Sequence, residues 1–496
     1  VLAECYKPIT EARILDGAGR IRRIVNTLDW LSWDAGPTLL RWMAGEAPET
    51  YRAFVEADAR SVRRLGHGNA MAAPFHHVIL PLASRRDKVT EVRWGIRDFR
   101  RRFGRAPEGM WLPETAVDLE TLSVLAEEGI RFTVLAPHQV EGAPEDGGPG
   151  SVALPGGRSI AVFPYDGGLS HGVAFGQLLK DAESWERAIR DPGEEARRAL
   201  VTIATDGETF GHHHRWGDMA LAAVVERLAE APDLRIENPA SYLAANPSLP
   251  PLELVEDTSW SCAHGVERWR RSCGCRMDVN EPPAQEWREP LRQGLVELAH
   301  GLHALFQEAG QGWTLDPWEA RDRYGDVVDA GPQARARFAR ALLSPGSPDA
   351  DIGRVLGLLE MERDALRMFT SCGWFFDDIG GLEPLQVLRY AAHAIDAAGG
   401  ASADLEAALL RHLREARSMD PALGDGGRIW TEAVRRAPEV EAAGHADEGK
   451  EDVTAAQPAL WSVMEDLLPA ERKPLAPSAR DLGFSEEALQ ARSLRA

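Results

Sequence analysis

The chain has 496 residues, with 56 Lys and Arg against 77 Asp and Glu, which gives a formal net charge of −21 at pH 7. This acidic balance argues against a sequence-independent nucleic-acid binder and against docking on an anionic membrane, because both need surplus cations. A hydrophobic fraction of 44% is typical of a globular protein. The 15 Trp exceed the 14 Phe and 6 Tyr, which weakly indicates a sugar-binding surface, since flat indole faces suit sugar rings.

Two features bear on the compartment. No apolar run reaches the roughly 18 residues of a membrane span, and no basic-then-apolar leader opens the chain. The 5 cysteines are an odd number in a long chain, which disfavours a disulfide framework. We therefore expect a cytoplasmic protein. Because Val1 opens a segment that looks ordered, we also expect that an N-terminal piece is missing.

Between residues 110 and 206, short apolar runs alternate with helical patterns. Such an alternation predicts parallel strands joined by right-handed crossovers. The predicted strands are residues 109–112, 132–135, 160–163 and 199–204. An acidic residue follows the carboxyl end of three of them, namely Glu114, Asp166 and Asp206. In a parallel β/α barrel, catalytic side chains collect at this end.

From about residue 250 the pattern changes, and long helical periodicities dominate. They cover residues 291–309, 350–369 and 385–398. Residues 437–456 are rich in Ala, Glu, Gly and Asp and are predicted to be flexible. We predict an α/β fold with a barrel in residues 1–250, a helical domain in residues 251–436 and a partly flexible segment in residues 437–496.

The strongest candidates for chemistry are two carboxylates. Glu114 ends the sequence Trp-Leu-Pro-Glu, and Asp206 opens Asp-Gly-Glu-Thr-Phe-Gly, which three histidines follow. Glycoside cleavage needs one group that protonates the departing oxygen and another that stabilises or attacks the anomeric carbon. The alternative, that an acid after a strand caps a helix, stays open for Asp206 taken alone.

Five segments together resemble the conserved regions of glycoside hydrolase family 57, which acts on α-glucans. They follow the family's order and are residues 66–83, 111–114, 206–211, 259–269 and 371–381. The resemblance implies an incomplete seven-stranded β/α barrel, a helical domain that closes over its mouth, and a retaining mechanism without a metal or other cofactor. It also implies an α-glucan or maltooligosaccharide as the partner.

By motif position, the resemblance implies that Glu114 is the nucleophile, Asp206 the general acid/base and Glu208 a supporting carboxylate. One of the two catalytic groups should then have a raised pKa, since an acid must stay protonated near neutral pH. The other residues assigned to substrate binding are His67, Asn69, His77, Trp111, Asp166, His212, His213, Trp260, His264, Trp269, Trp374, Asp377 and Asp378. Core filling stays open for the tryptophans at 260, 269 and 374, and turn formation for Asp166.

Two groups of residues have side chains that could bind a metal ion. His212, His213 and His214 with Asp206 and Glu208 would suit a deacetylase, but adjacent histidines cannot all face one ion. Cys262, His264, Cys273 and Cys275 have the composition of a zinc site. Their Cys-Gly-Cys pair is tighter than the usual Cys-x₂₋₄-Cys, so we expect buried thiols there.

The sequence thus predicts a retaining hydrolase or transglycosylase of the α-amylase, 4-α-glucanotransferase or branching type. The alternatives are a metal-dependent carbohydrate deacetylase and a non-catalytic glucan-binding protein derived from the enzyme. No residue chooses between hydrolysis and transfer, and none predicts the oligomeric state.

Overall fold

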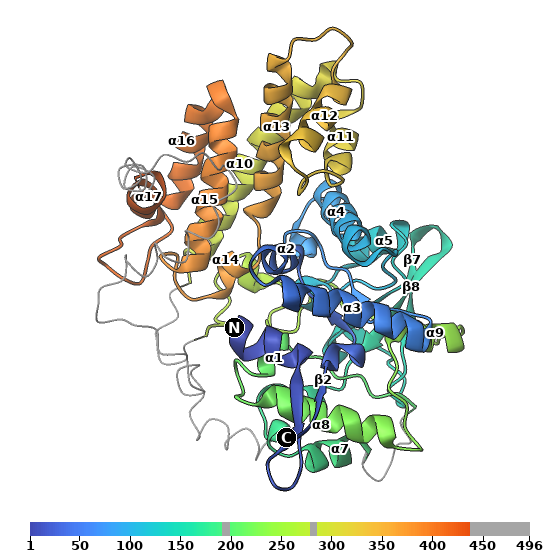
Figure 1. Cartoon of the computed structure of the whole chain (residues 1–496). Coiled ribbons are helices and arrows are strands. Elements are labelled where there is room, and N and C mark those ends of the chain that lie inside the picture. Colours follow the sequence, from blue (N-terminus) through green and yellow to red (C-terminus); the bar gives the residue numbers. More distant parts are fainter. Residues whose placement is uncertain (191–198, 278–284, 437–496) are drawn as a thin grey trace.

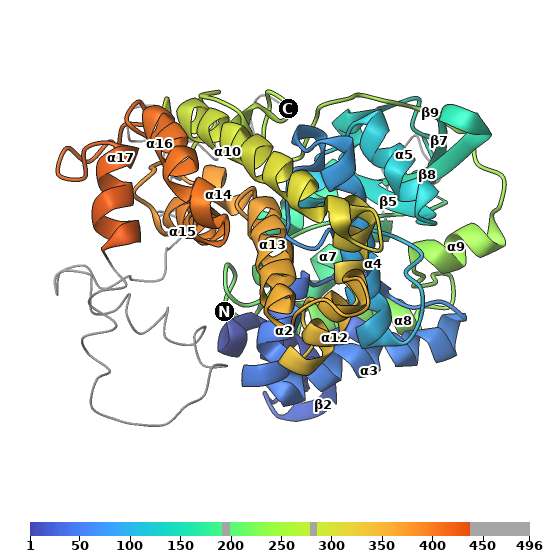
Figure 2. The same cartoon turned by 90° about the horizontal axis from the view of Figure 1, so that it is seen from above.

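The computed structural model describes residues 1–190, 199–277 and 285–436. The predicted flexible segment 437–496 lies outside the described residues. The named strands end at Leu254, and the long helices from α10 (Arg288–Ala309) onward form a separate group, which stands above the α/β part in Figure 1. Seen from above in Figure 2, α10 crosses over the α/β part, and the last helices of the chain extend to the left of it.

A row of short parallel strands forms the centre of the α/β part. Ala72 bridges Met110 and Gly109 bridges Phe132, and these two contacts connect the paired strands on either side. The row runs through β3 (Trp33–Asp34), β4 (Ala70–Met71), residues 109–110, β5 (Phe132–Leu135) and β8 (Arg158–Pro164). The pairing is parallel, as the alternation of strands and helices predicts.

Helices connect the members of this row. The side chain of Ser84 accepts a hydrogen bond at the start of α4 (Arg85–Phe103), and the residue after this helix, Gly104, has a φ of 66°, a left-handed conformation that suits glycine. Val92, Phe99 and Leu122 belong to the core beneath the strands. The connecting helices are α3 (Pro48–Leu65), α4 (Arg85–Phe103) and α5 (Leu119–Glu127), and further helices are α1 (Lys7–Thr10), α2 (Pro37–Glu46), α6 (Gly167–Ala174), α7 (Ala182–Arg190), α8 (Gly217–Glu230) and α9 (Pro239–Ala245).

Additional strands extend the sheet beyond β8. β7 (Gly150–Leu154) pairs antiparallel with β8, β9 (Pro251–Leu254) pairs parallel with β7, and β6 (Val140–Glu141) pairs antiparallel with β9. β1 (Ala12–Leu15) and β2 (Ile21–Val25) form a separate hairpin. The sequence did not predict β7, because Gly and Pro crowd the stretch just before it. Gly150 is required by packing, since a Cβ there would lie 2.3 Å from Leu252 Cγ.

The strand predicted at residues 199–204 is wrong in detail. This segment pairs with no strand, although Leu200, Ile203 and Ala204 pack against the core. Its backbone partners come from loops and a side chain: Thr202 O accepts from Asp166 N at 2.7 Å, and Ala204 N donates to Ser170 Oγ at 3.1 Å. The apolar run therefore predicted burial correctly, but its hydrogen bonds do not form a strand.

The three long helices predicted after residue 250 are present. They are α10, α13 (Ala350–Arg367) and α15 (Leu382–Ala397). Their buried faces share one core, in which Leu295, Leu359 and Leu388 are fully buried. The other helices of this part are α11 (Pro317–Tyr324), α12 (Pro332–Leu342), α14 (Cys372–Phe375), α16 (Ser402–Leu413) and α17 (Gly426–Ile429).

The helical part is joined to the α/β part mainly through α4. Trp94 is fully buried, and its Nε1 donates to the carbonyl oxygen of Arg321 at 3.1 Å. A second junction lies near the end of the parallel row, where Val78 bridges Thr370 in an antiparallel pair. These contacts fix the start of α14 next to the loop that contains His77.

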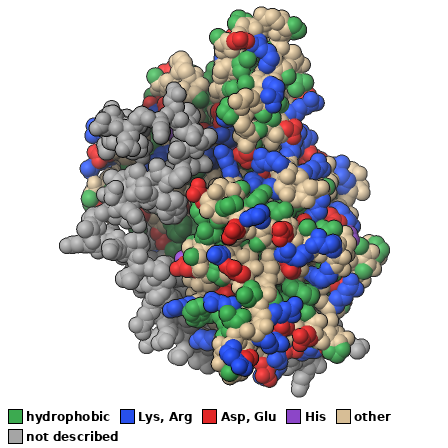
Figure 3. All heavy atoms as spheres, in the orientation of Figure 1, with side chains coloured by type: hydrophobic (Ala, Val, Ile, Leu, Met, Phe, Trp, Pro, Cys, Tyr) green, Lys and Arg blue, Asp and Glu red, His purple; other side chains and the backbone are tan. Residues whose placement is uncertain are grey.

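The surface shows no single dominant charge on the face drawn in Figure 3, where basic and acidic side chains are interspersed. Within residues 1–190, 199–277 and 285–436, no helix has the length and apolar character needed to cross a membrane.

Candidate active site

Glu114 lies on a strained turn directly after the bridged residues 109–110. Glu114 and Thr115 have φ values of 57° and 51°, in the left-handed region that residues other than glycine rarely adopt. Such conformations cost on the order of 1–3 kcal/mol each and persist where the surroundings enforce them. Buried Gln139 does so here, because its Nε2 donates to Thr115 O at 2.8 Å and its Oε1 accepts from Thr115 Oγ1 at 2.7 Å.

The carboxylate of Glu114 is oriented by the loop that follows β9. Its Oε2 accepts hydrogen bonds from Trp260 Nε1 at 3.0 Å and from the hydroxyl of Ser261. The backbone of the same loop is also attached, since Trp260 N donates to Glu114 O at 3.0 Å. A carboxylate with two fixed donors has a defined direction, which a nucleophile requires.

Asp206 stands at the start of η8 (Gly207–Thr209), in the position of a helix cap, but its side chain makes no capping hydrogen bond. The capping alternative is therefore not what the structure shows. Desolvation by the surrounding protein raises the pKa of Asp206 to about 7, and the charges of Glu114 and Glu208 contribute. Asp206 is nevertheless accessible to solvent. A reachable carboxyl group with this pKa is suited to give and take a proton near neutral pH.

A further acid, Asp34, belongs to the same cluster, and the sequence analysis missed it. It ends β3, and desolvation, Glu208 and Asp206 together raise its pKa to about 7. The available signal was an acid directly after a short run with Leu31 and Trp33, the same pattern that marked the acids chosen from other strands.

The N-terminal residues complete the loop that carries Glu208. Tyr6 donates its hydroxyl hydrogen to Glu208 Oε1, and burial together with Glu208 raises the pKa of Tyr6. Cys5 Sγ donates to Gly207 O at 3.0 Å. A Cβ on Gly211 would lie 1.9 Å from the carbonyl oxygen of Glu4, so this loop fits closely against the chain start. No local signal in the sequence identifies these contacts.

Aromatic rings line the region beside the two carboxylates. The ring centroids of Trp111 and Trp260 lie 5.1 Å apart, and those of Tyr165 and Trp260 lie 6.3 Å apart. All three side chains are partly exposed. Burial and the charge of Asp206 raise the pKa of Tyr165 to about 12. The structure thus brings Trp111 and Trp260 together with Glu114, and it adds Tyr165.

His77 is held near Glu114 by the helical part. It adopts a φ of 56°, and its Nδ1 lies 2.9 Å from Ser371 Oγ. Burial lowers the pKa of His77, and the charges of Glu114 and Glu208 oppose that effect. His77 is therefore a neutral imidazole near the carboxylate cluster.

The three consecutive histidines face different partners. His212 Nδ1 lies 2.6 Å from Glu4 Oε2, and His214 Nε2 lies 2.7 Å from the carbonyl oxygen of Ala174. Burial and, to a lesser degree, His212 lower the pKa of His213, while Glu208 acts in the opposite direction. The charge of Glu208 thus acts on His213, and His212 is engaged by Glu4.

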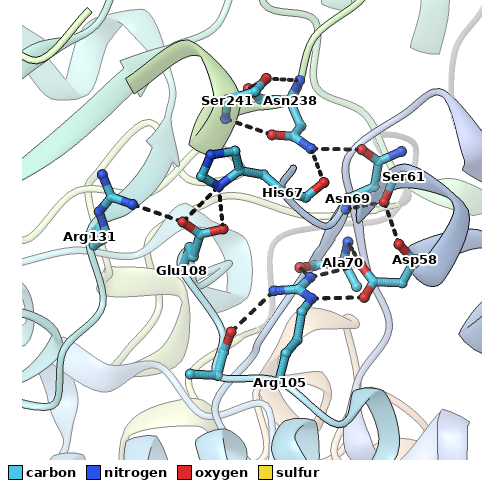
Figure 4. A network of polar contacts seen from close by, with 11 residues as sticks. Asp58, Ser61, His67, Asn69, Ala70, Arg105, Glu108, Arg131, Asn238 and Ser241 are labelled. Carbon is cyan, nitrogen blue, oxygen red and sulfur yellow. Dashed lines mark hydrogen bonds and ion pairs between the residues drawn. The ribbon is translucent and has the colours of Figure 1, made fainter. Parts of the chain in front are cut away.

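His67 and Asn69 are not brought to the carboxylates. Both precede β4 and so lie at the amino ends of the parallel strands, whereas Glu114 lies at the carboxyl ends. Figure 4 shows them in a polar network with Asn238 and Glu108. Asn69, 1% exposed, donates to Leu28 O and accepts from Asn238 Nδ2, each at 3.0 Å. His67 Nδ1 lies 2.9 Å from Glu108 Oε2. This network supports the base of the strand row.

Three other residues that were predicted to bind substrate have structural roles instead. Asp166 caps α6, because its Oδ1 accepts from Leu169 N at 2.8 Å. Trp269 and Trp374 are fully buried in the core of the helical part, so no ring face is available to a sugar. Core filling, the open alternative for these two tryptophans, is what the structure shows.

The paired acids after α14 also make internal contacts. Asp377 Oδ2 accepts from Met277 N at 2.8 Å. Asp378 accepts from Met419 N at 2.6 Å and from Gly380 N at 2.7 Å. These bonds tie loops of the helical part together. His264 lies instead beside Cys275, with 3.5 Å between His264 Nδ1 and Cys275 Sγ.

Comparisons with known proteins agree with the motifs. Residues 21–247 match the model of Glycosyl hydrolase family 57, and residues 284–443 match a Domain of unknown function (DUF3536). The 4-alpha-glucanotransferase of Thermococcus litoralis is 26% identical over 184 residues, which is 36% of this chain and 26% of that protein. The Alpha-amylase of Pyrococcus furiosus is 25% identical over 215 residues, which is 42% of this chain and 29% of that protein. The matched stretches are thus less than a third of these curated relatives.

A solved structure shares the fold over most of both chains. It is that of an exo-type maltose-forming amylase from Pyrococcus sp. ST04, with a TM-score of 0.66 and 15% sequence identity. The likeness covers 84% of this chain and 83% of that chain. Within residues 21–247, the family model agrees with the resemblance drawn from the sequence segments at 66–83, 111–114 and 206–211.

Proposed function

We propose that this chain, whose residues 21–247 match the model of glycosyl hydrolase family 57, is a retaining glycoside hydrolase or transglycosylase acting on α-glucans or maltooligosaccharides. Glu114 attacks the anomeric carbon while Asp206 donates a proton to the departing glycosidic oxygen. In the second step, Asp206 takes a proton from water or from the hydroxyl of an acceptor sugar, which then displaces Glu114.

The observation that carries this proposal is the difference in environment between two neighbouring carboxyl groups. Glu114 accepts two hydrogen bonds, from Trp260 and Ser261. Asp206 has a pKa raised to about 7 by desolvation, Glu114 and Glu208. Acid and nucleophile roles are separated by such a difference in environment.

The aromatic rings beside the carboxylates support a sugar as the substrate. Trp111, Trp260 and Tyr165 offer apolar faces on which a pyranose ring can lie, and their polar atoms remain at the edges. The neutral imidazoles of His77 and His213 can each donate or accept a hydrogen bond with a glucose hydroxyl.

The proposal extends to the architecture and the compartment. We take the parallel row as part of the seven-stranded incomplete barrel that the family resemblance implies, with residues 251–436 as the domain that closes over it. A cytoplasmic location remains our expectation, and the five free thiols are consistent with a reducing compartment.

The first experiment separates the roles of the two acids with α-maltotriosyl fluoride, whose leaving group needs no protonation. In Asp206→Asn, attack by Glu114 should proceed but water should not be activated, so a glycosyl-enzyme should accumulate. Mass spectrometry of digested protein should find the maltotriosyl group on Glu114. Glu114→Gln should form no adduct, and both variants should lose turnover of maltoheptaose by at least about a thousandfold.

The matched control is Glu141→Gln, an exposed acid on β6, which should retain full turnover. A ladder of longer and shorter products from wild-type protein on maltoheptaose indicates transfer, and shorter products alone indicate hydrolysis. Binding of maltoheptaose without any product would contradict the proposal and favour a non-catalytic glucan-binding protein. Release of acetate from an acetylated glycan that a chelator abolishes and a divalent ion restores would favour the deacetylase.

A further inference from the structure

Four side chains away from the carboxylate cluster bring their ligand atoms together. The Sγ atom of Cys262 lies 3.9 Å from that of Cys273 and 3.7 Å from that of Cys275. Cys275 Sγ lies 3.5 Å from His264 Nδ1. One ligand atom from each of the four residues falls within 4.8 Å of all the others. Among the described residues, this is the group of histidines, cysteines and acids that could hold one ion.

These distances fit a tetrahedral zinc ion. With Zn–S bonds of about 2.3 Å and a Zn–N bond of about 2.0–2.1 Å, tetrahedral angles place two sulfurs about 3.8 Å apart and a sulfur and a nitrogen about 3.6 Å apart. Three of the six separations, at 3.7, 3.9 and 3.5 Å, agree with these figures, and all six lie within 4.8 Å. A disulfide would require about 2.05 Å, so the thiols are not bonded to each other.

The backbone conformation explains how a Cys-Gly-Cys pair can supply two ligands to one ion. Gly274 adopts a φ of 83°, which bends the chain so that both flanking thiols face the same point. The other ligand pair sits on a turn in which Gly265 N donates to Cys262 O at 3.1 Å. Gly265 has a φ of 79°, and a Cβ there would lie 2.1 Å from the carbonyl oxygen of Asp257. The close packing at Gly265 fixes the turn that carries Cys262 and His264.

The charges around the four ligands favour the site with zinc bound. Three thiolates and Zn²⁺ carry a net charge of −1. Arg288 is fully buried and donates to Cys275 O at 3.2 Å, and its ion pair within the part of the chain that the structure describes, with Asp377, is long, at 3.9 Å. Arg268 is 4% exposed and donates to Ser261 O at 3.1 Å. Buried cations need a compensating negative charge nearby, which a zinc–thiolate centre supplies.

We propose that Cys262, His264, Cys273 and Cys275 form a closed structural zinc site. Four protein ligands leave no open position, which is typical of structural rather than catalytic zinc. The site follows directly after Trp260 and Ser261, the two donors to the Glu114 carboxylate. Zinc thus fixes the loop that orients Glu114, and its binding is independent of the reaction proposed above.

The test uses the full chain, purified under reducing conditions and without immobilised metal. Elemental analysis should find about one zinc per chain in wild-type protein after incubation with Zn²⁺ and removal of the excess. The double variant Cys273→Ser/Cys275→Ser should hold less than about a tenth of that amount, whereas Cys372→Ser, a matched thiol outside the group, should hold all of it. Replacement by Co²⁺ should give a thiolate-to-metal charge-transfer band and the strong visible bands of tetrahedral cobalt.

His264→Ala keeps the three thiols and covers the case in which the double variant does not fold. It should lose zinc to a competing chelator more than about tenfold faster than wild-type protein. The proposal is overturned if wild-type protein takes up no zinc, or if the double variant retains it. A cobalt spectrum without thiolate bands, or a disulfide between Cys262 and Cys275 in reduced, freshly purified protein, would overturn it as well.

Discussion

At the scale of single residues, the site is a cluster of four carboxyl groups with different environments. Glu114 is held by two donors, Glu208 accepts from Tyr6, and both Asp34 and Asp206 have pKa values raised to about 7. Close acids cannot all be ionised at neutral pH, because each charge raises the pKa of its neighbours. In the mechanism proposed above, the cluster therefore keeps a proton available for the leaving group.

The raised pKa of Asp206 sets the alkaline limb of activity. Asp206 must be protonated to act as an acid, so kcat/KM should fall as pH rises through about 7. Glu208→Gln removes one of the charges that raise this pKa, so the alkaline limb should move to lower pH by roughly one unit. The measurement is kcat/KM for maltoheptaose against pH, which reports groups of the free enzyme.

Tyr6→Phe is the control for this shift, because it removes the hydrogen bond to Glu208 and keeps the charge. It should leave the alkaline limb within a few tenths of a unit of the wild-type position. If Glu208→Gln leaves the limb in place or moves it to higher pH, the electrostatic role given to Glu208 is wrong.

At the scale of elements, the turn formed by η4 (Pro113–Thr115) depends on a residue from a different loop. Gln139 accepts from Ala136 N at 2.9 Å and exchanges two hydrogen bonds with Thr115. It thereby joins the end of β5 to the strained pair Glu114 and Thr115. The left-handed backbone conformation of these two residues is unfavourable by itself, and tertiary hydrogen bonds stabilise it.

Gln139→Leu should release this turn. Buried partners left without a hydrogen bond cost about 1–3 kcal/mol each, so the free energy of unfolding should fall by roughly 2–4 kcal/mol. Because the backbone turn that carries Glu114 would be held less firmly, kcat should fall by about a hundredfold. Denaturant unfolding and steady-state kinetics measure the two effects.

Gln139→Glu separates the accepted from the donated hydrogen bonds, because it keeps the two that Oε1 accepts and loses the donations of Nε2 to Thr115 O and Thr258 Oγ1. Its loss of kcat should lie between those of wild-type protein and Gln139→Leu. Full kcat in a destabilised Gln139→Leu variant would show that the position of Glu114 does not depend on this bridge.

At the scale of the whole molecule, the α/β part and the helical part share a buried junction. Trp94 of α4 donates to the carbonyl oxygens of Arg321 and Asp322, each at 3.1 Å. Arg321 is itself fully buried and pairs with Asp87 of α4 at 2.9 Å and with Glu362 of α13 at 2.8 Å. A buried charge pair that spans both parts is costly to break, so we expect the two parts to unfold together.

Gly325→Ala tests this coupling at the junction. A Cβ at Gly325 would lie 2.4 Å from Trp94 Cδ1 and 2.9 Å from Trp94 Cγ, so the indole would have to move. Overpacking of this kind costs about 1–3 kcal/mol. Calorimetry should show one unfolding transition at a lower Tm than that of wild-type protein.

Gly357→Ala on α13 is the matched control, because a Cβ there meets nothing within 4 Å. Inside a helix, this change should be neutral or should stabilise by about 0.5–1 kcal/mol. If Gly325→Ala splits the transition, or shifts only one of two transitions, the two parts unfold separately and the coupling is wrong.

Local patterns in the sequence determined several elements and both principal acids. Residues 132–135 are the strand β5, the three long helices lie where their periodicity predicts, and Glu114 and Asp206 follow the ends of apolar runs. These properties depend on neighbours a few residues away, because helical and strand periodicity and strand ends are local.

Only the tertiary structure decided which residues face one another. Tyr6 and Glu208 are 202 residues apart in the chain, and no local pattern relates them. His67 and Asn69 share a motif with His77, yet they lie at the opposite end of the strands. Cys262 and Cys275 meet because two glycines with positive φ bend the chain toward one point. Side-chain convergence depends on the path of the backbone between distant segments, and that path is fixed by packing of the whole chain.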